Sequence, residues 1–400
     1  MKHAKQFGAL ALALTMALTA LAGCGSKNPG TTVNPTAGSG SMPDASSEAT
    51  AQVTPMDLSQ VTDPFFAVSG LAGKEVVAKL GETEISAADY LYWLNRVIDN
   101  YLSQFGGQMT TLPWDAEMAE GITFGQYMQD QAMDAATFHC MLRELARQEG
   151  VSPDPSIALD MDKQYADMVV QAGSNEEQVI HTLWASMLTK DLLIRLNENS
   201  GLYDQLQELY FGENSGSYPT DAEVNAYLEE SGQYRAKHIL LATIDLDTRE
   251  PLDDATIAQK KATADDLLSQ LRAAEDPVAL FDTLMNEYSE DSGLATNPDG
   301  YTTQKGAMVE PFENAALALQ NGEISEVVES DFGYHIILRL PMNPDDFRAE
   351  CISAQMDELM SLEQERLGLE KTDALPALDV GSFWNKMLSL RAAVQAELAG

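Results

Sequence analysis

Residues 234–243 read Tyr-Arg-Ala-Lys-His-Ile-Leu-Leu-Ala-Thr, and residues 332–339 read Phe-Gly-Tyr-His-Ile-Ile-Leu-Arg. Each stretch is short and rich in β-branched, aromatic and leucine side chains, a composition typical of β-strands. Each also carries one of the five histidines of the chain, His238 in the first and His335 in the second. The two stretches therefore predict strands of one small sheet, each with an imidazole on it.

The segment between these strands is mostly helical in pattern. Apolar residues recur at helical spacing over about 254–274 and 277–288, and a shorter helix is expected over 310–319. Residues 322–328 and the second strand together predict a closing hairpin. This order of elements predicts an α+β domain that begins and ends with a strand.

Five motifs in this region resemble the parvulin family of peptidyl-prolyl cis–trans isomerases. They are Ala236-Lys-His-Ile-Leu240, Ser289-Glu-Asp291, Gly306-Ala-Met308 with Pro311-Phe-Glu313, Gly322-Glu-Ile-Ser325 and Phe332-Gly-Tyr-His-Ile-Ile337. The resemblance covers about residues 233–342. It implies an antiparallel sheet with surrounding helices, and an activity that rotates X–Pro peptide bonds.

The same resemblance implies roles for six residues. His238 and His335 would be the paired imidazoles at the centre of the site, and Asp291 would lie beside the twisting carbonyl. The proline cup and its rim would be formed by Met308, Phe312 and Phe332. The residues themselves favour the pair, because two of only five histidines lie on apolar strands. Two buried histidines that only hold the fold are the alternative, and the two roles are compatible.

The expected reaction needs neither a metal nor a cofactor. Rotation about an X–Pro amide breaks no bond to carbon, and its barrier of about 18–20 kcal/mol comes from the partial double bond. A pocket that holds the proline ring and weakens amide resonance in the twisted state is sufficient. The five histidines also show no tight metal-ligand spacing such as HExxH.

Two departures from the parvulin pattern bear on activity. Many parvulins carry Gly-Gly-Asp-Leu-Gly-x-Phe before the methionine, where residues 297–303 here read Asn-Pro-Asp-Gly-Tyr-Thr-Thr. Gly300 and Thr303 thus replace two apolar walls of the cup, unless Tyr301 turns inward to replace one. After the first strand, residues 244–259 contain a single base, Arg249, among several acids. Selectivity for phosphoserine-proline is therefore excluded, because a dianion would meet like charge.

Outside the parvulin-like region the sequence is mostly helical in pattern. A strand at 75–80 precedes a helix capped by Ser86 with Asp89, and a long helix over 124–149 ends at Gly150. The other expected helices cover 156–172, a stretch from a capping box at 174–177 to about Tyr210, 221–230 after the cap Thr220, 349–367 and 380–398.

The first residues resemble the signal of a bacterial lipoprotein. Lys2 and Lys5 precede an apolar run over 7–21 that is too short for a membrane span. The run ends in Leu21-Ala-Gly-Cys24, which resembles a lipobox. By that resemblance the chain is cut before Cys24, whose thiol carries a diacylglycerol; an ordinary secretory signal is the alternative. The following Gly-, Ser-, Thr- and Pro-rich segment predicts a flexible tether.

The whole layout resembles the PrsA-like extracellular foldases, relatives of the SurA chaperones, in which the N- and C-terminal segments pack into one chaperone domain. The expected fold class is α+β, with a parvulin-like domain inserted in a mostly helical SurA-like chaperone domain. The expected boundaries are 1–23 for the signal peptide, 24–62 for the tether, 70–232 and 343–400 for the two parts of the chaperone domain, and 233–342 for the parvulin-type domain.

Composition limits the partners of the chain. With 24 Lys and Arg against 62 Asp and Glu, the 400-residue chain has a formal net charge of −38. Such a charge repels phosphate backbones and excludes nucleic-acid binding. Three cysteines cannot form a disulfide framework, and Cys140 and Cys351 are either a pair or two buried thiols. The sequence leaves a homodimer through the helical part open.

Two functions from different classes remain. In the first, the protein isomerises X–Pro bonds of unfolded secreted polypeptides while its lipid holds it on the extracytoplasmic face of a membrane, in a Gram-positive envelope by its layout. In the second, it is a holdase whose parvulin domain is catalytically weak or inactive. The altered 297–303 loop favours the second, and the intact motif residues favour the first. A substrate-binding lipoprotein for a transporter is less favoured, because no repeated α/β pattern with a hinge is visible.

Overall fold

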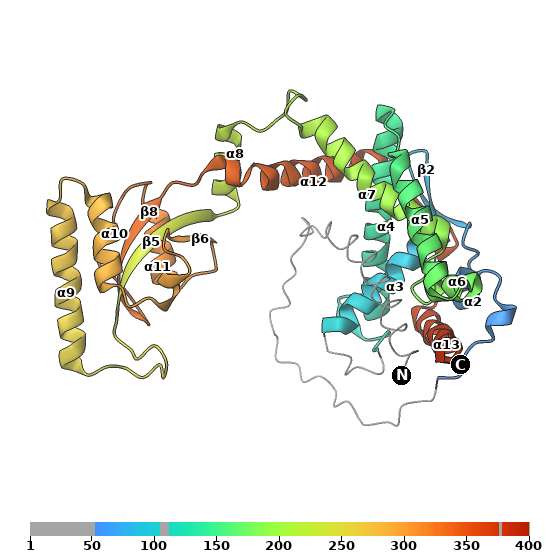
Figure 1. Cartoon of the computed structure of the whole chain (residues 1–400), viewed down its shortest axis with the longest axis horizontal. Helices are drawn as coiled ribbons and strands as arrows, with labels where there is room; N and C mark the ends of the chain where they lie inside the picture. Colours follow the sequence, from blue (N-terminus) through green and yellow to red (C-terminus); the bar gives the residue numbers. More distant parts are fainter. Residues whose placement is uncertain (1–52, 105–111, 376–377, 400) are drawn as a thin grey trace. The chain divides into compact units, whose positions relative to one another are not determined.

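The computed structural model describes residues 53–104, 112–375 and 378–399. The expected signal peptide, Cys24 and most of the tether lie outside these residues. The chain forms two compact units: one comprises residues 218–354, and the other combines the residues before 218 with those from 355 onward. The elements of both units are labelled in Figure 1. In the described part of the chain, no helix is both long and apolar enough to cross a membrane.

A four-stranded antiparallel sheet forms the middle of the 218–354 unit. Its strand order is β6-β5-β8-β7, from the short edge strand β6 (Tyr301–Gln304) through β5 (Gln233–Ala242) and β8 (Gly333–Leu340) to β7 (Val328–Ser330). The two stretches that predicted strands are therefore the central, adjacent pair. In their register His238 lies opposite Ile337, and Leu240 lies opposite His335.

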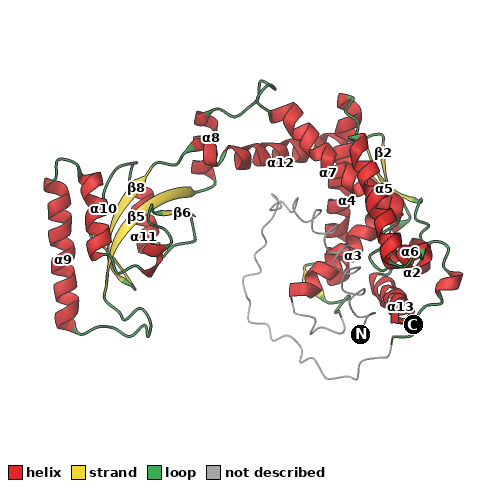
Figure 2. Cartoon of the chain, in the orientation of Figure 1, coloured by secondary structure: helices red, strands yellow, loops and turns green. Residues whose placement is uncertain are grey.

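Alternation along the central strands gives the sheet two different faces. Ile239 and Ile336 pack under α9 (Asp254–Ala273) and α10 (Pro277–Tyr288). Ala236 and Ile337 pack against α11 (Glu310–Ala318) on the opposite face, and Figure 2 shows the helices on the two sides of the sheet. Because side chains alternate with period two, His238 and His335 lie on the α11 face.

Two glycines hold turns that carry the site. Gly333 has φ +145°, and a Cβ there would overlap the carbonyl oxygen of Leu241. Gly300 has φ +94°, and its Cβ would lie 2.8 Å from the carbonyl oxygen of Ala236. These φ values lie in a region that L side chains rarely adopt, so only glycine lets each turn approach β5 this closely.

A short helix, α8 (Asp221–Glu230), belongs to the same unit. Thr220 and Glu223 form the expected capping box at its start. Its buried side chains pack with Cys351, which is a free thiol, as is the buried Cys140 of the other unit. The compact unit thus begins at Tyr218, some residues before the boundary at 233 that the sequence suggests.

The other unit is mainly helical and is built from both ends of the chain. Its elements, besides the part of α12 (Arg348–Leu367) from residue 355 onward, are η2 (Leu58–Gln60), α2 (Pro64–Ser69), α3 (Ala87–Gln104), α4 (Phe124–Glu149), α5 (Pro155–Gln171), α6 (Glu176–Trp184), α7 (Lys190–Phe211), α13 (Val380–Ala399), and the strands β1 (Val76–Leu80), β2 (Thr83–Ser86), β3 (Glu117–Ala119), β4 (Ile122–Thr123) and β9 (Leu369–Lys371).

One hydrophobic core joins the two ends of the chain in this unit. Phe383 and Met387 of α13 are fully buried in the same cluster as Phe65 and Tyr90. In the sheet, β1 lies between β2 and β9, with Ala78 opposite Lys371. The expected α+β fold, with N- and C-terminal segments packed together around an insert, is confirmed.

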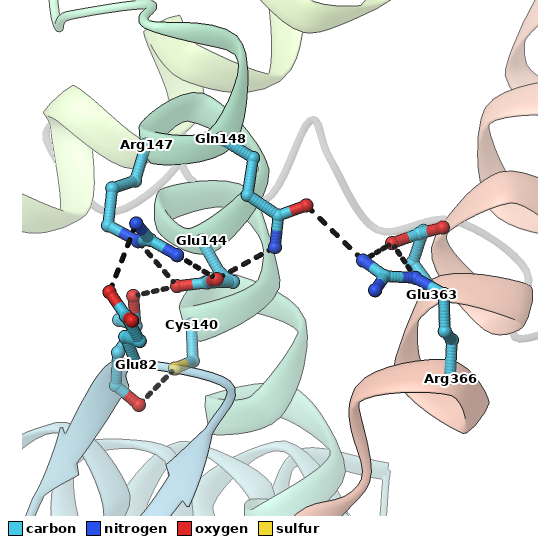
Figure 3. Close-up of polar contacts among 8 residues, drawn as sticks. Glu82, Cys140, Glu144, Arg147, Gln148, Glu363 and Arg366 are labelled. Carbon is cyan, nitrogen blue, oxygen red and sulfur yellow. Dashed lines mark hydrogen bonds and ion pairs between the residues drawn. The ribbon is translucent and has the colours of Figure 1, made fainter.

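Ion pairs reinforce the contact between the two ends. Arg391 on α13 donates to both carboxylate oxygens of Asp99 on α3, at 2.9 and 2.6 Å. Figure 3 shows a second network, centred on the buried carboxylate of Glu144 on α4. Glu144 accepts hydrogen bonds from Thr83, Arg147 and Gln148, and that from Arg147 is the main reason its pKa falls to about 2.

Most helices occur where the sequence predicts them, including the long helix that ends at Gly150. The Ser86–Asp89 cap is confirmed, because Asp89 N–H donates to Ser86 Oγ and the Asp89 carboxylate accepts from Ser86. The predicted cap at Ser174 is wrong. Asn175 caps α6 by accepting from Gln178 N–H, while Ser174 has a positive φ of 67° that ends the preceding turn.

Candidate active site

The two histidines of the central strands form a direct contact. Nδ1 of His238 lies 3.0 Å from Nδ1 of His335, and the two ring planes are inclined by only 11°. The register explains this contact, because His335 faces Leu240, two residues beyond His238 and on the same face of the sheet. His335 is 3% exposed, so the pair lies within the unit.

Asp291 extends the pair on the side of His238. Its Oδ2 atom lies 3.0 Å from Nε2 of His238, and its Oδ1 atom accepts the N–H of Gly293 at 3.0 Å. The preceding residues attach this segment to β5, since Ser289 Oγ accepts Leu240 N–H and Glu290 N–H donates to the Leu240 carbonyl. The short strand β6 ends before this part of β5, which leaves its edge free for the loop.

Ser330 and Tyr301 complete the array at its two ends. Ser330 Oγ lies 2.7 Å from Nε2 of His335, and the hydroxyl of Tyr301 donates to Oδ2 of Asp291 at 2.5 Å. The site thus contains a continuous hydrogen-bonded chain of five side chains, in the order Ser330, His335, His238, Asp291 and Tyr301.

The hydrogen bonds assign one tautomer to each histidine. An ionised Asp291 only accepts, so His238 donates from Nε2, and the Nδ1 atom of a neutral His238 is then an acceptor. His335 must then donate from Nδ1, and its Nε2 accepts the hydroxyl proton of Ser330. Both imidazoles are neutral in this arrangement, and every polar atom of the two rings has a partner.

The ionisation of the site fits this assignment. Burial, with a smaller contribution from His238, lowers the pKa of His335 to about 3. The hydrogen bond from His238 is the main cause that holds the pKa of Asp291 well below its ordinary value, and Tyr301 and Gly293 add to it. Burial and the neighbouring carboxylate raise the pKa of Tyr301. The site therefore holds an ionised Asp291 beside an uncharged His335.

Apolar side chains cover the histidines from the α11 side. The ring of Phe312 meets both imidazoles edge-on, with centroid distances of 5.2 Å to His238 and 5.6 Å to His335. Met308 packs in the same cluster as Phe312. Phe332 lies in the turn before β8, where its N–H donates to Ser330 Oγ and its ring lies 5.7 Å from the Arg249 guanidinium.

The structure therefore brings together four of the six residues implied by the sequence: His238, His335, Asp291 and Phe312. Met308 joins them through Phe312, and Phe332 joins them through the backbone of its turn. The sequence did not predict a role for Ser330, and it suggested Tyr301 only as a substitute for a missing apolar side chain of the proline cup. Tyr301 could have been found by pairing β6 with β5, because it then lies opposite Ala236, on the face of the sheet that carries His238.

Known proteins resemble the chain most clearly in this region. Residues 238–340 match the family model described as Rotamase, PPIC-type PPIASE domain. The chain is 38% identical over 84 residues to peptidyl-prolyl cis-trans isomerase Pin1 of Malus domestica, which covers 20% of this chain and 69% of that protein.

Foldases resemble a longer part of the chain. Foldase protein PrsA of Bacillus subtilis is 32% identical over 146 residues, 36% of this chain and 43% of the foldase. Foldase protein PrsA of Caldanaerobacter subterraneus is 27% identical over 275 residues, 68% of this chain and 74% of that protein. The chain thus spans less than half the length of the Bacillus subtilis relative. A solved structure of PrsA from Bacillus subtilis is 22% identical, with a TM-score of 0.23, and covers 64% of this chain and 91% of that one.

Proposed function

Since the chain belongs to the parvulin family of peptidyl-prolyl cis–trans isomerases and is PrsA-like in sequence, we propose that it isomerises X–Pro bonds in polypeptides folding outside the cytoplasmic membrane. The contact of His238, His335 and Asp291 beneath Phe312 is the observation that carries this proposal. In it, His238, His335 and Asp291 act on the amide, while Met308, Phe312 and Phe332 hold the proline.

The proposed chemistry follows from the charge distribution of an amide. The planar amide has a partly negative oxygen and a partly positive nitrogen, and both charges diminish when the C–N bond twists. An apolar surface such as Phe312 and an anion such as Asp291 near the carbonyl oxygen both disfavour the planar form relative to the twisted one. Lowering the barrier by about 5–7 kcal/mol would accelerate rotation roughly 10⁴- to 10⁵-fold.

The neutral histidines suit this role. A buried imidazolium beside Asp291 would cancel the charge that disfavours the planar amide, and neither ring carries one in the tautomers assigned above. Because Ser330 and Asp291 occupy the outer nitrogens, the two rings cannot rotate freely. In this proposal they hold Asp291 and shape the site rather than transfer a proton.

The proposed clients are unfolded secreted polypeptides that contain X–Pro bonds. Uncatalysed isomerisation takes tens of seconds, which leaves such chains open to proteolysis and aggregation. The Leu21–Cys24 motif supports anchoring through a lipid on Cys24, on the extracytoplasmic face of a Gram-positive membrane. Mass spectrometry of the membrane-bound protein would detect a lipid on Cys24, and an unmodified N-terminus there would exclude it.

A holdase with a weak isomerase domain is the second candidate. The observation in its favour is the loop at 297–303, where Gly300 approaches the backbone of β5 and leaves no room for the leucine of the parvulin pattern. Thr303 faces the same side of the sheet as Tyr234, with a shorter side chain than the phenylalanine of the pattern. Both changes reduce the apolar area that can hold a proline ring.

A prolyl isomerisation assay on the chain separates these candidates. We expect wild-type protein to accelerate isomerisation of an Ala-Pro-Phe peptide, and Met308→Ala to lower kcat/KM by about tenfold, because a buried contact with proline is lost. Met118→Ala is the matched control, since Met118 is 53% exposed in the other unit. It should leave the rate unchanged.

The outcomes are distinct. Acceleration that falls in Met308→Ala alone supports the isomerase. A folded wild-type chain that suppresses aggregation of a denatured protein without accelerating isomerisation would instead identify a holdase. Equal rates in the Met308→Ala and wild-type proteins would remove Met308 from the proposed proline cup.

A further inference from the structure

Tyr301 occupies a position that the parvulin pattern gives to glycine, and its side chain reaches the centre of the site. In β6 it lies opposite Ala236, so its ring extends over the face that carries His238. The ring meets the His238 imidazole edge-on at a centroid distance of 5.8 Å. Its hydroxyl donates to Oδ2 of Asp291, the same oxygen that lies 3.0 Å from His238 Nε2.

Gly293 provides the space for this hydroxyl. A Cβ at Gly293 would overlap the Tyr301 hydroxyl oxygen and would lie 3.2 Å from the Cζ atom of the ring. The φ angle of Gly293 does not require glycine. Glycine at position 293 therefore makes room for the Tyr301 phenol, and it is not required by the backbone conformation.

The hydroxyl restricts the Asp291 carboxylate on its open side. Asp291 accepts from Gly293 N–H at one oxygen, and from both His238 and Tyr301 at the other. Without the phenol, Oδ2 would be held by the imidazole alone, and the carboxylate could turn about its last torsion. A turned carboxylate no longer compels His238 to keep its proton on Nε2.

We propose that Tyr301 is a positioning residue of the isomerase site, which holds Asp291 and thereby fixes the tautomers of His238 and His335. This inference rests on the proposed function, because it concerns the same site. Tyr301 acts through Asp291 and is not itself required to contact the amide. In this chain the Tyr301 phenol thus holds Asp291 by a hydrogen bond, beside a proline cup in which Gly300 and Thr303 replace two apolar residues of the parvulin pattern.

The decisive variant is Tyr301→Phe, which keeps the ring and removes only the hydroxyl. We expect kcat to fall about tenfold with KM unchanged, since a hydrogen bond to a charged group is lost from the array that acts on the twisted amide. Tyr288→Phe is the matched control, because Tyr288 is an exposed tyrosine of the same unit.

Nitrogen-15 NMR of the full chain with labelled histidine provides a readout independent of activity. In wild-type protein we expect His238 to show a protonated Nε2 and an unprotonated Nδ1, and His335 the reverse. In Tyr301→Phe both patterns should move toward a mixture of tautomers, while Tyr288→Phe should match the wild type.

Gly293→Ala tests the same contact from the other side. Its added methyl group displaces the hydroxyl, so this variant should lose about as much activity as Tyr301→Phe, and the double variant should lose no more than either single one. Additive losses in the double variant would contradict the proposed coupling.

Failure of this inference is separable from failure of the proposed function. An inactive wild-type chain would overturn the isomerase, while the histidine spectra would still test the Tyr301 contact. An active wild type with unchanged kcat and unchanged spectra in Tyr301→Phe would overturn the positioning role and leave the isomerase intact.

Discussion

At the scale of single residues, the site depends on a buried histidine, His335, that stays uncharged. His335 is almost fully buried and has its Nε2 occupied by a hydroxyl and its Nδ1 by another imidazole. In the assigned tautomer Nδ1 already carries a proton, so a second proton would go to Nε2, and the Ser330 hydroxyl would have to accept there instead of donating. Burial therefore couples the charge of His335 to the stability of the unit.

This coupling predicts how stability depends on pH. The pKa of His335 is lowered from 6.5 to about 3, so the unfolded chain binds its proton first as pH falls. The contribution of this residue to stability should therefore be complete above pH 6.5 and decrease between pH 6.5 and pH 3, by up to about 5 kcal/mol. Thermal unfolding of wild type and His335→Gln across this range measures the difference.

The comparison with His335→Gln is necessary because His139, in the other unit, has a pKa lowered by burial to about 4 and contributes with the same sign. Asp291 contributes with the same sign only near the lower end of this range, because the unfolded carboxyl takes up its proton near the ordinary pKa of 3.8 while the folded one stays ionised. Parallel pH curves for wild type and variant would show that His335 is not the coupled group.

The motif residues of the site could be predicted because each lies in a recognisable local pattern. His238 and His335 lie on apolar strands, and Asp291 follows a helix in a short Ser-Glu-Asp run. Ser330 gave no such signal, because a serine in a turn is common and its contact with His335 depends on the three-residue pairing of β7 with β8. Tyr301 required the register of β6, which the sequence did not predict.

At the scale of elements, the turn between β7 and β8 controls where His335 lies. Gly333 begins β8 with φ +145°, and a Cβ at this position would overlap the Leu241 carbonyl oxygen. We expect Gly333→Ala to lower the free energy of unfolding by about 3 kcal/mol or more, because both the backbone strain and the overlap oppose the side chain. Urea unfolding measures this change.

Gly306→Ala is the matched control. Gly306 also has a positive φ, +90°, but a Cβ there would meet nothing within 4 Å. It should lower the free energy of unfolding by only about 1–2 kcal/mol, the cost of a left-handed conformation for an L residue. Equal losses in the two variants would show that the close approach to Leu241 has no effect on stability.

The helices could be predicted closely because each has its own periodicity and caps. Observed bounds such as Asp254–Ala273 and Pro277–Tyr288 differ little from those expected. The short strands β2 and β9 were missed, since three or four residues carry little pattern. The pairing of β9 with β1 also joins residues almost 300 positions apart, which no local signal reports.

At the scale of the whole molecule, the two units have separate hydrophobic cores. Phe383 is fully buried in the core made from both chain ends, and Phe281 is fully buried under the sheet of the other unit. Calorimetry should therefore resolve two unfolding transitions. Phe383→Ala should destabilise one by about 3–5 kcal/mol, and Phe281→Ala should destabilise the other by a similar amount.

Each phenylalanine variant is the control for the other. Each should leave the second transition at the temperature of the wild type, because the two side chains belong to separate hydrophobic cores. A single transition that moves equally in both variants would mean that the units unfold together.

The core that joins both ends of the chain has a consequence for the time at which it can form. During synthesis the residues emerge from the N-terminus onward, so β1 and α3 leave the ribosome long before β9 and α13 exist. The 218–354 unit is complete once residue 354 has been synthesised. It can therefore fold before the other unit has all of its residues. The earliest part of this protein thus stays unfinished until the last residues arrive, and for that interval it is itself an exposed, unfolded polypeptide.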